Sequence, residues 1–316
     1  MAKLDALVAL VTTAPGLLGK RELALVKPFG GDGDDAAVIP HGDGFLVICG
    51  EAISPPFLRA DPYGAGSAAV VTNVSDVRAM GARALGIVDM LVSPDRDHAN
   101  AVLDGIRWAS DRLGVPVVGG HLTLGHEPAL SASATGFAKA PLQAGNAKPG
   151  DTLIAAFAID GRYMSDDTDF FTALHDRSPA QLQQDGEALV EVAERRLCHA
   201  ARDVSMPGIA GSLLQMIEGA HAGATLDVDA IPRPAGVPVE RWLMTFPSFG
   251  FLLAAPPEHV GEAVETFRRR GLAAAPCGHF DATKTLTLIH DGVSAVAWDL
   301  NTTPLTGLVR SPSAGA

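Results

Sequence analysis

The spacing of apolar residues predicts a chain built from alternating short helices and strands. In residues 66–81, Val70, Val74 and Val77 recur at i, i+4 and i+7, so this stretch predicts a helix with one apolar stripe. Residues 129–138 alternate small polar and apolar side chains, which is typical of a half-buried strand. The same reasoning predicts further helices at 3–11, 98–114, 179–200, 208–220 and 257–270, and further strands at 36–40, 45–51, 84–93, 115–120, 152–160, 249–255 and 272–280.

The breaks in this pattern divide the chain into two halves. Residues 139–151, rich in Gly, Pro and Lys, read as a junction between a domain at 1–140 and a second domain at 150–310. Glycines and prolines make residues 12–35 and the loop at 52–64 look irregular, and the tail at 311–316 is expected to be disordered. Because both halves mix strands and helices, the predicted fold class is α/β (α+β).

Composition narrows the class of protein. The 316 residues are 47% hydrophobic, enough for two cores, and the net charge of −12 without a basic stripe argues against a nucleic-acid partner. Cys49, Cys198 and Cys277 are too far apart for a metal or disulfide motif, which fits a reducing, cytoplasmic location. No apolar run reaches about 18 residues, so no membrane span is expected.

An acidic loop precedes the first strand. In "GDGDDAAVI" (31–39), Asp34 and Asp35 could supply carboxylate oxygens to Mg²⁺, the ligands that this cation prefers. The alternative is a tight turn, because Asp and Gly are both favoured there. Asp32 is assigned to the turn in either case.

The predicted helix at 66–81 carries a second candidate. Asn73 and Asp76, in "NVSDVRAMGA", are three residues apart and share a face away from the valine stripe, so they could point at a ligand. The alternative is a solvated helix face.

Glycines and a histidine follow the strand at 115–120. Gly119 and Gly120 would let backbone amides approach a phosphate or a base, and His121 comes directly after them, at what is predicted to be a strand end where ligands bind in α/β folds. The alternative is a glycine turn with His121 as a polar loop residue.

Three weaker signals remain. In "ARDVSMPGIAGSLLQMIEG" (201–219), Asp203 or Ser205 is expected to cap the following helix, and the other could face a cleft. The acids of "SDDTDFF" (165–171) favour a solvated loop over a metal site. Lys20 and Lys27 are close enough in sequence to the acidic loop to reach a polyphosphate. The sequence contains no GxxxxGK[ST], GxGxxG or GxSxG motif.

Taken together, the order of these motifs resembles the superfamily of AIR synthase, selenophosphate synthetase, thiamine-monophosphate kinase and the hydrogenase maturation protein HypE. The resemblance spans about residues 30–280. It rests on "GDDAAVI" (33–39), "DPYGAGSAAVVTNVSDVRAMGA" (61–82), "VVGGHLTLGHEPALSASATGFA" (117–138), "DVSMPGIAGSLLQMI" (203–217) and "SFGFLLAAPPEHVGEAVETFRRRG" (248–271).

This resemblance implies a two-domain PurM-like fold. In it, two N-terminal domains pair through their strands into a barrel, so a homodimer is expected, and ATP lies in a cleft between the domains. Asp34, Asp35 and Asp76 would hold Mg²⁺ with Asn73 beside them. Near the nucleotide the resemblance places Gly119, Gly120 and His121, and the candidate phosphate contact is Lys27, with Lys20 as the alternative. The shared chemistry is attack on, or transfer of, the γ-phosphate of ATP, in which the protein mainly positions and neutralises phosphates.

Departures from the family pattern leave the acceptor substrate undetermined. Residues 12–35 lack the Cys of selenophosphate synthetases, Glu51 stands where relatives have a metal-binding Asp, and Met206 replaces the second acid of the thiamine-monophosphate kinase motif. The sequence therefore predicts an ATP- and Mg²⁺-dependent enzyme acting on an unidentified small molecule, with Asp34, Asp76 and Asp203 as catalytic candidates. Rival hypotheses are a thiamine-monophosphate kinase, a selenophosphate synthetase-like enzyme, and a nucleotide-binding scaffold without turnover.

Overall fold

The computed structural model describes residues 2–22, 33–166 and 168–308, which form two compact units. One unit comprises residues 35–141 and 174–191 and is called the five-stranded unit here. The other comprises residues 1–34, 142–173 and 192–316 and is called the seven-stranded unit. Each has its own hydrophobic core.

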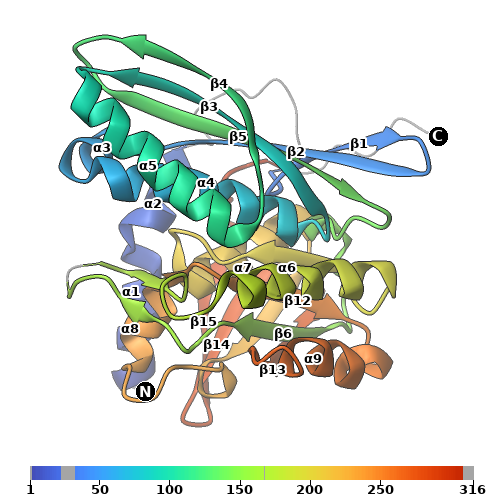
Figure 1. Ribbon diagram of the computed structural model, residues 1–316. Coiled ribbons are helices and arrows are strands. Elements are labelled where there is room, and N and C mark those ends of the chain that lie inside the picture. The colour runs from blue at the N-terminus through green and yellow to red at the C-terminus, as the bar shows by residue number, and fades with distance from the viewer. Residues whose placement is uncertain (1, 23–32, 167, 309–316) are drawn as a thin grey trace. The chain divides into compact units, whose positions relative to one another are not determined.

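The five-stranded unit is a mixed sheet in the order β1-β2-β5-β3-β4, with helices α4 and α5 packed side by side on one face (Figure 1). All neighbouring strands are antiparallel except β3 and β4, which are parallel. Its elements are β1 (Ala37–His41), β2 (Gly44–Ala52), α3 (Pro55–Ala60), α4 (Pro62–Ala79), β3 (Arg83–Ser93), α5 (Arg96–Leu113), β4 (Val117–Leu124), β5 (Ala129–Ala138) and most of α6 (Pro179–Glu194).

One face of this sheet is covered and the other is open. On β5, Leu130, Ala132 and Ala134 are buried, in alternation with residues that are only partly covered. Large apolar side chains therefore lie exposed on the strands: Ile39, Ile48, Val88 and Met90 are all more than a third exposed. The two-residue period of a strand explains the pattern, because only one face packs against α4 and α5.

The segment 174–191 joins this unit from far along the chain. Arg177 and Asp185 form a buried ion pair with two 2.9 Å contacts, and both side chains are at most 2% exposed. Arg78 of α4 donates to the Leu182 carbonyl oxygen and packs against Gly186. Buried charges require partners: the Arg177–Asp185 pair stabilises the segment itself, and the contacts of Arg78 attach α6 to α4.

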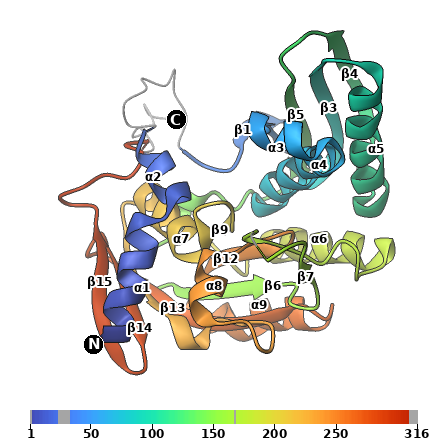
Figure 2. The same ribbon diagram turned by 90° about the vertical axis from the view of Figure 1, so that its left-hand side faces the viewer.

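The seven-stranded unit has the sheet order β15-β14-β10-β13-β6-β12-β9. Helices α7 and α9 cover opposite faces of it, and α1 lies along β14 and β15 (Figure 2). A small sheet, β11-β8-β7, completes the unit. Its elements are α1 (Ala2–Thr13), α2 (Pro15–Glu22), the 3₁₀ turns η2 (Ala144–Asn146), η3 (Val228–Ala230) and η4 (Pro257–His259), β6 (Thr152–Phe157), β7 (Arg162–Tyr163), β8 (Phe170–Thr172), β9 (Ala200–Asp203), α7 (Gly208–Ala220), β10 (Gly223–Asp227), α8 (Val239–Met244), β11 (Phe246–Pro247), β12 (Gly250–Ala255), α9 (Val260–Arg268), β13 (Ala273–Asp281), β14 (Thr285–His290) and β15 (Val293–Asp299).

The predicted mixed α/β class is confirmed, and most predicted elements are present. Three local predictions are wrong. Residues 15–22 form α2 and residues 55–60 form α3, because a proline is tolerated at the first turn of a helix. The strand predicted at 115–120 does not end at its glycines but continues to Leu124.

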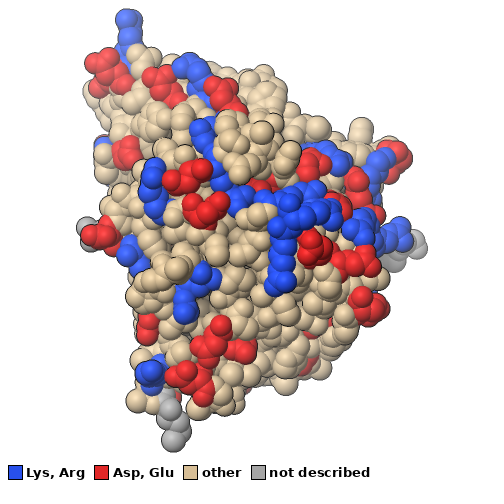
Figure 3. All heavy atoms as spheres, turned by 60° about the horizontal axis from the view of Figure 1, so that its bottom comes forward, with Lys and Arg blue, Asp and Glu red and all other residues tan. Residues whose placement is uncertain are grey.

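Charged groups of both signs are interspersed on the face shown in Figure 3, where Lys and Arg lie next to Asp and Glu. Over residues 2–22, 33–166 and 168–308, no single helix is long and apolar enough to cross a membrane. The pair Ala2–Thr13 and Pro15–Arg21, bent by 49°, meets the length and composition criteria only when both helices are taken together.

Candidate metal centre

Helix α4 buries the two polar residues that the sequence singled out. Asp61 caps the helix by accepting from the Gly64 amide, and Pro62 occupies its first turn. Asn73 is fully buried and Asp76 is 7% exposed. The alternative interpretation of a solvated helix face is therefore wrong for this pair, because the surface of α4 opposite the valines is covered as well.

Asn73 is held by strand β2. The Cys49 thiol donates to the Asn73 side-chain oxygen Oδ1 and to its backbone oxygen, both at 3.3 Å from Sγ. The Asn73 amide nitrogen donates to the Ala69 carbonyl oxygen, 2.8 Å away. The amide is thus fixed in orientation by its own helix and by the neighbouring strand.

Asp35 and Asp76 bring two carboxylates together inside the five-stranded unit. Each offers an oxygen within 4.8 Å of the other. One oxygen from each carboxylate is thus close enough for both to reach the same hard cation, and Mg²⁺ prefers such oxygen ligands. Two like charges this close repel each other, and a bound cation removes the repulsion.

The charge at this site affects the thiol beside it. Burial, followed by the negative charge of Asp76, raises the pKa of Cys49 above its usual range, and Glu51 and Asp35 add to the effect. Three carboxylates therefore act on one buried group. Sequence reasoning did not single out Cys49; the only available signal was its place in an apolar strand two residues before Glu51.

Glu51 lies on β2 and is exposed. Residues i and i+2 of a strand share a face, so Glu51 projects to the same side of the sheet as Cys49. Its role as a metal ligand stays a prediction.

Asp34 belongs to the seven-stranded unit. Its carboxylate accepts a hydrogen bond from the Ala144 amide, 2.9 Å away, at the first residue of η2. This contact anchors the acidic loop, and the predicted metal and catalytic roles of Asp34 stay predictions. Lys27 and Asp32 lie outside the described residues, whereas Lys20 lies in α2.

Asp203 is the last residue of β9 and is 7% exposed, also in the seven-stranded unit. The expectation that Asp203 or Ser205 caps the next helix is wrong: the N-cap of α7 is Pro207, without a side-chain capping bond. Ser205 instead contributes its backbone, since its amide donates to the Ser212 hydroxyl and its carbonyl accepts from the Gly208 amide.

The motif with two glycines and a histidine lies in the middle of β4, not at a strand end. Gly120 pairs with Asp89, and a Cβ at Gly120 would lie 2.3 Å from Asp89 Oδ1. Burial raises the pKa of Asp89, which is 7% exposed. His121 pairs with Met90 on the open face of the sheet.

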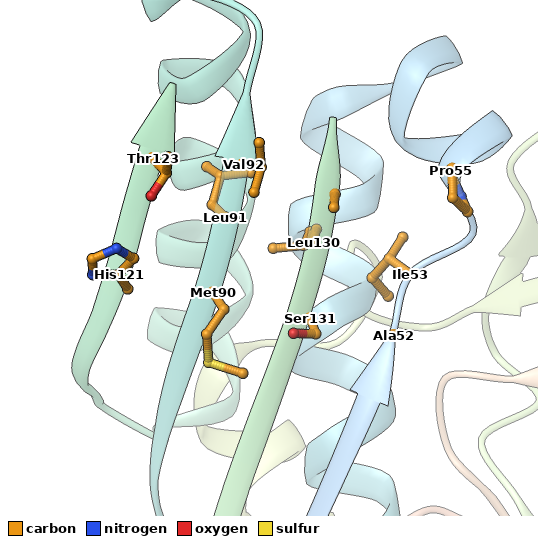
Figure 4. A pocket seen from close by; sticks show the side chains of 11 residues that line it. Ala52, Ile53, Pro55, Met90, Leu91, Val92, His121, Thr123, Leu130 and Ser131 are labelled. Atoms are coloured by element: carbon orange, nitrogen blue, oxygen red, sulfur yellow. The ribbon is translucent and has the colours of Figure 1, made fainter. Parts of the chain in front are cut away.

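His121 lines a pocket of about 460 Å³ on that face (Figure 4). Met90 and Val92 of β3, Thr123 of β4 and Ser131 of β5 line it as well. The lining is mostly apolar with a few polar groups, which suits a partly apolar ligand. Sequence reasoning found His121 but missed Met90 and Ser131, because their meeting depends on strand order.

These features define a two-unit mixed α/β protein whose five-stranded unit brings a carboxylate from the loop before β1, Asp35, close to a buried carboxylate on helix α4, Asp76. Known proteins share this plan. The N-terminal domain of AIR synthase related proteins matches residues 33–138, and the C-terminal domain of the same family matches residues 149–291. The chain belongs to the AIR synthase-related family.

Three individual proteins illustrate the similarity. An uncharacterized protein of Synechocystis sp. is 37% identical over 304 residues, 92% of this chain and 94% of the relative. Selenide, water dikinase of Myxococcus xanthus is 33% identical over 221 residues, 65% of this chain and 61% of the enzyme. The structure of Thermotoga maritima PurL complexed with ADP superposes with a TM-score of 0.73 at 19% identity, covering 88% of this chain and 46% of PurL. The likeness to PurL shows a common fold.

Proposed function

We propose that the protein is an ATP- and Mg²⁺-dependent enzyme that phosphorylates or activates a small molecule. The observation that carries this proposal is the pair formed by Asp35, in the partly buried loop before β1, and Asp76, buried on helix α4, whose oxygens lie within 4.8 Å of each other. Membership of a family that includes a selenide, water dikinase, and the fold shared with an ADP-bound PurL, support a nucleotide substrate.

The proposed roles follow from residue chemistry. Asp35 and Asp76 hold Mg²⁺, with Asp34 and Glu51 as further ligands and Asn73 beside them. Mg²⁺, when bound, neutralises phosphate oxygens and orients the γ-phosphate for transfer. Gly119, Gly120 and His121 on β4 lie near the nucleotide, and Lys27 near its phosphates. Asp203, buried at the end of β9, faces the acceptor.

We also propose that the active form is a homodimer. Ile39, Ile48, Val88 and Met90 leave the open face of the five-stranded sheet apolar, and a second copy of the same face would cover it. Three buried free cysteines suit a reducing, cytoplasmic compartment.

The acceptor is a small molecule of undetermined class. A selenide-like acceptor is supported by the Myxococcus relative, but residues 12–35 contain no Cys. The changed motif around Met206, whose side chain is 63% exposed, supports a second candidate function: a nucleotide-binding protein without turnover.

The test compares Asp76→Asn and Asp35→Asn with Asp104→Asn, a control in which an exposed aspartate of α5 loses its surface partner Arg107. Mg²⁺-ATP binding is measured by calorimetry, and ATP turnover is measured with a panel of acceptors that includes thiamine monophosphate and selenide. The proposal expects wild type and Asp104→Asn to turn over ATP, and Asp76→Asn to lose on the order of 100-fold.

Two results would contradict the enzyme proposal in different ways. Tight Mg²⁺-ATP binding with no turnover on any acceptor would favour the nucleotide-binding protein. Absence of binding by a folded wild-type protein would reject both functions.

A further inference from the structure

The carboxylate of Glu218 on α7 is a buried anchor that the proposed chemistry does not use. Glu218 is 6% exposed. Its two oxygens accept from the amides of Leu305, Thr306 and Gly307, at 2.7 to 3.3 Å, and from the Thr306 hydroxyl at 2.5 Å. A buried carboxylate with several donors is a strong, directional attachment. It fixes residues 305–308, called the C-terminal strap here.

The strap continues from this anchor to the acidic loop. The Thr306 hydroxyl accepts from the Leu308 amide at 3.0 Å, so one side chain links Glu218 to the end of the strap. Leu308 packs on Gly33, where an added Cβ would come within 2.9 Å of the Leu308 Cβ. Gly33 has φ +67, a conformation that glycine adopts without strain.

Two other contacts hold the same turn. Arg202, 5% exposed on β9, donates to the Gly33 carbonyl oxygen at 3.2 Å. The Ala144 amide donates to Asp34. Contacts from Leu308, Arg202 and Ala144 therefore hold Gly33 and Asp34 in place within the seven-stranded unit. The next residue in the chain is Asp35.

We propose that the C-terminal strap, anchored by Glu218 through Thr306, is a positioning element that sets the conformation of the acidic loop and thereby the affinity of Asp35 for Mg²⁺. The inference rests on the proposed function for its catalytic consequence, but its structural part is independent of ATP. Thr306 and Leu308 are positioning residues and touch no reacting group. Holding ligands in place before the cation arrives strengthens binding, because less conformational freedom is lost on binding.

The test uses the full-length chain with Thr306→Val, which keeps the size of the side chain and removes the hydroxyl that links Glu218 to Leu308. Thr306→Ser restores the hydroxyl and serves as the rescue. Thr302→Val is the matched control, because among the described residues the Thr302 hydroxyl bonds only the nearby Asp299 carbonyl oxygen. Leu308→Ala tests the other end of the strap.

Two readouts separate the strap from the function. Hydrogen exchange of the amides at residues 33–36 reports loop conformation without any substrate, and the Mg²⁺ concentration for half-maximal ATP turnover reports the site. We expect Thr306→Val and Leu308→Ala to speed exchange at 33–36 and to raise that Mg²⁺ concentration by about 3- to 10-fold, with kcat at saturating Mg²⁺ nearly unchanged. Thr306→Ser and Thr302→Val should behave as wild type.

The outcomes are distinct. Unchanged exchange at 33–36 in a folded Thr306→Val protein overturns the strap proposal whatever the activity. Equal losses in kcat and stability for Thr306→Val and Thr302→Val overturn it as well, since general destabilisation would then suffice. If Thr306→Val exchanges faster than wild type at 33–36 but the wild type shows no ATP turnover, the strap proposal stands and the proposed function is rejected.

Discussion

The Cys49 thiol donates to the Asn73 side-chain oxygen across 3.3 Å and so ties β2 to α4 one helical turn from Asp76. A thiol can donate only while it is protonated. Burial and the charge of Asp76 keep it protonated by raising its pKa. The negative site therefore stabilises the very form of Cys49 that holds Asn73.

The raised pKa values of the cysteines predict a loss of stability at alkaline pH. Cys49, Cys198 and Cys277 are all buried with pKa values raised above 9.0, first by burial. Above pH 9 the unfolded chain releases these protons while the folded chain keeps them, so the free energy of unfolding falls as pH rises, by on the order of 1 kcal/mol per thiol at pH 10. Below pH 8 the contribution is fully present.

Urea unfolding between pH 7.5 and 10 measures this slope. Cys49→Ser should reduce the fall in the free energy of unfolding by the contribution of one thiol, because serine does not ionise in this range. A slope identical to wild type would show that Cys49 already ionises in the folded protein.

We predict that an added side chain at Gly120 clashes with its surroundings, whereas one at Gly119 does not. A Cβ at Gly120 would lie 2.3 Å from Asp89 Oδ1, whereas at Gly119 the nearest atom is 3.7 Å away. We expect Gly120→Ala to destabilise the protein by about 1–3 kcal/mol and Gly119→Ala to change stability by less than about 0.5 kcal/mol. Thermal unfolding of both variants measures the difference, and similar midpoints would contradict the close approach of β4 to Asp89.

The open face of the five-stranded sheet predicts the oligomeric state. Val88 lies on that face and is 37% exposed; Val296 on β15 is 56% exposed. If a second copy covers the open face, Val88→Asp should shift the protein from dimer to monomer, because a charge would be buried at the interface. Val296→Asp is the control that should leave it a dimer. Sedimentation velocity distinguishes the two, and a monomeric wild type would reject the dimer.

The sequence predicted the elements of residues 36–138 well, missed β9, β10, β14, β15 and α8 in the seven-stranded unit, and indicated the site only in outline. Val70, Val74 and Val77 predicted α4, and the three-residue spacing of Asn73 and Asp76 placed both on one face. Their burial depends on the sheet and on α5, which no local pattern reveals. The hydrogen bond from Cys49 spans 24 residues and was equally invisible.

Errors had physical causes too. Gly119 and Gly120 suggested a strand end, yet here glycine makes room for the Asp89 carboxylate beside the strand. Pro15 and Pro55 suggested loops but open short helices. Glu218 gave no local signal, because its partners lie more than 80 residues further along the chain.

The segment 174–191, which holds the buried pair of Arg177 and Asp185, has a consequence for the synthesis of the protein. The five-stranded unit takes residues 174–191 from beyond a stretch that belongs to the other unit. A ribosome making this chain therefore releases residues 35–141 before the helix that packs on Arg78 exists. Domains usually fold in order of emergence, but this one waits, with Arg78 lacking its α6 contacts, until about fifty further residues have been translated. A fragment expressed only up to the junction near residue 141 would lack residues 174–191 and could never form the contacts between Arg78 and α6.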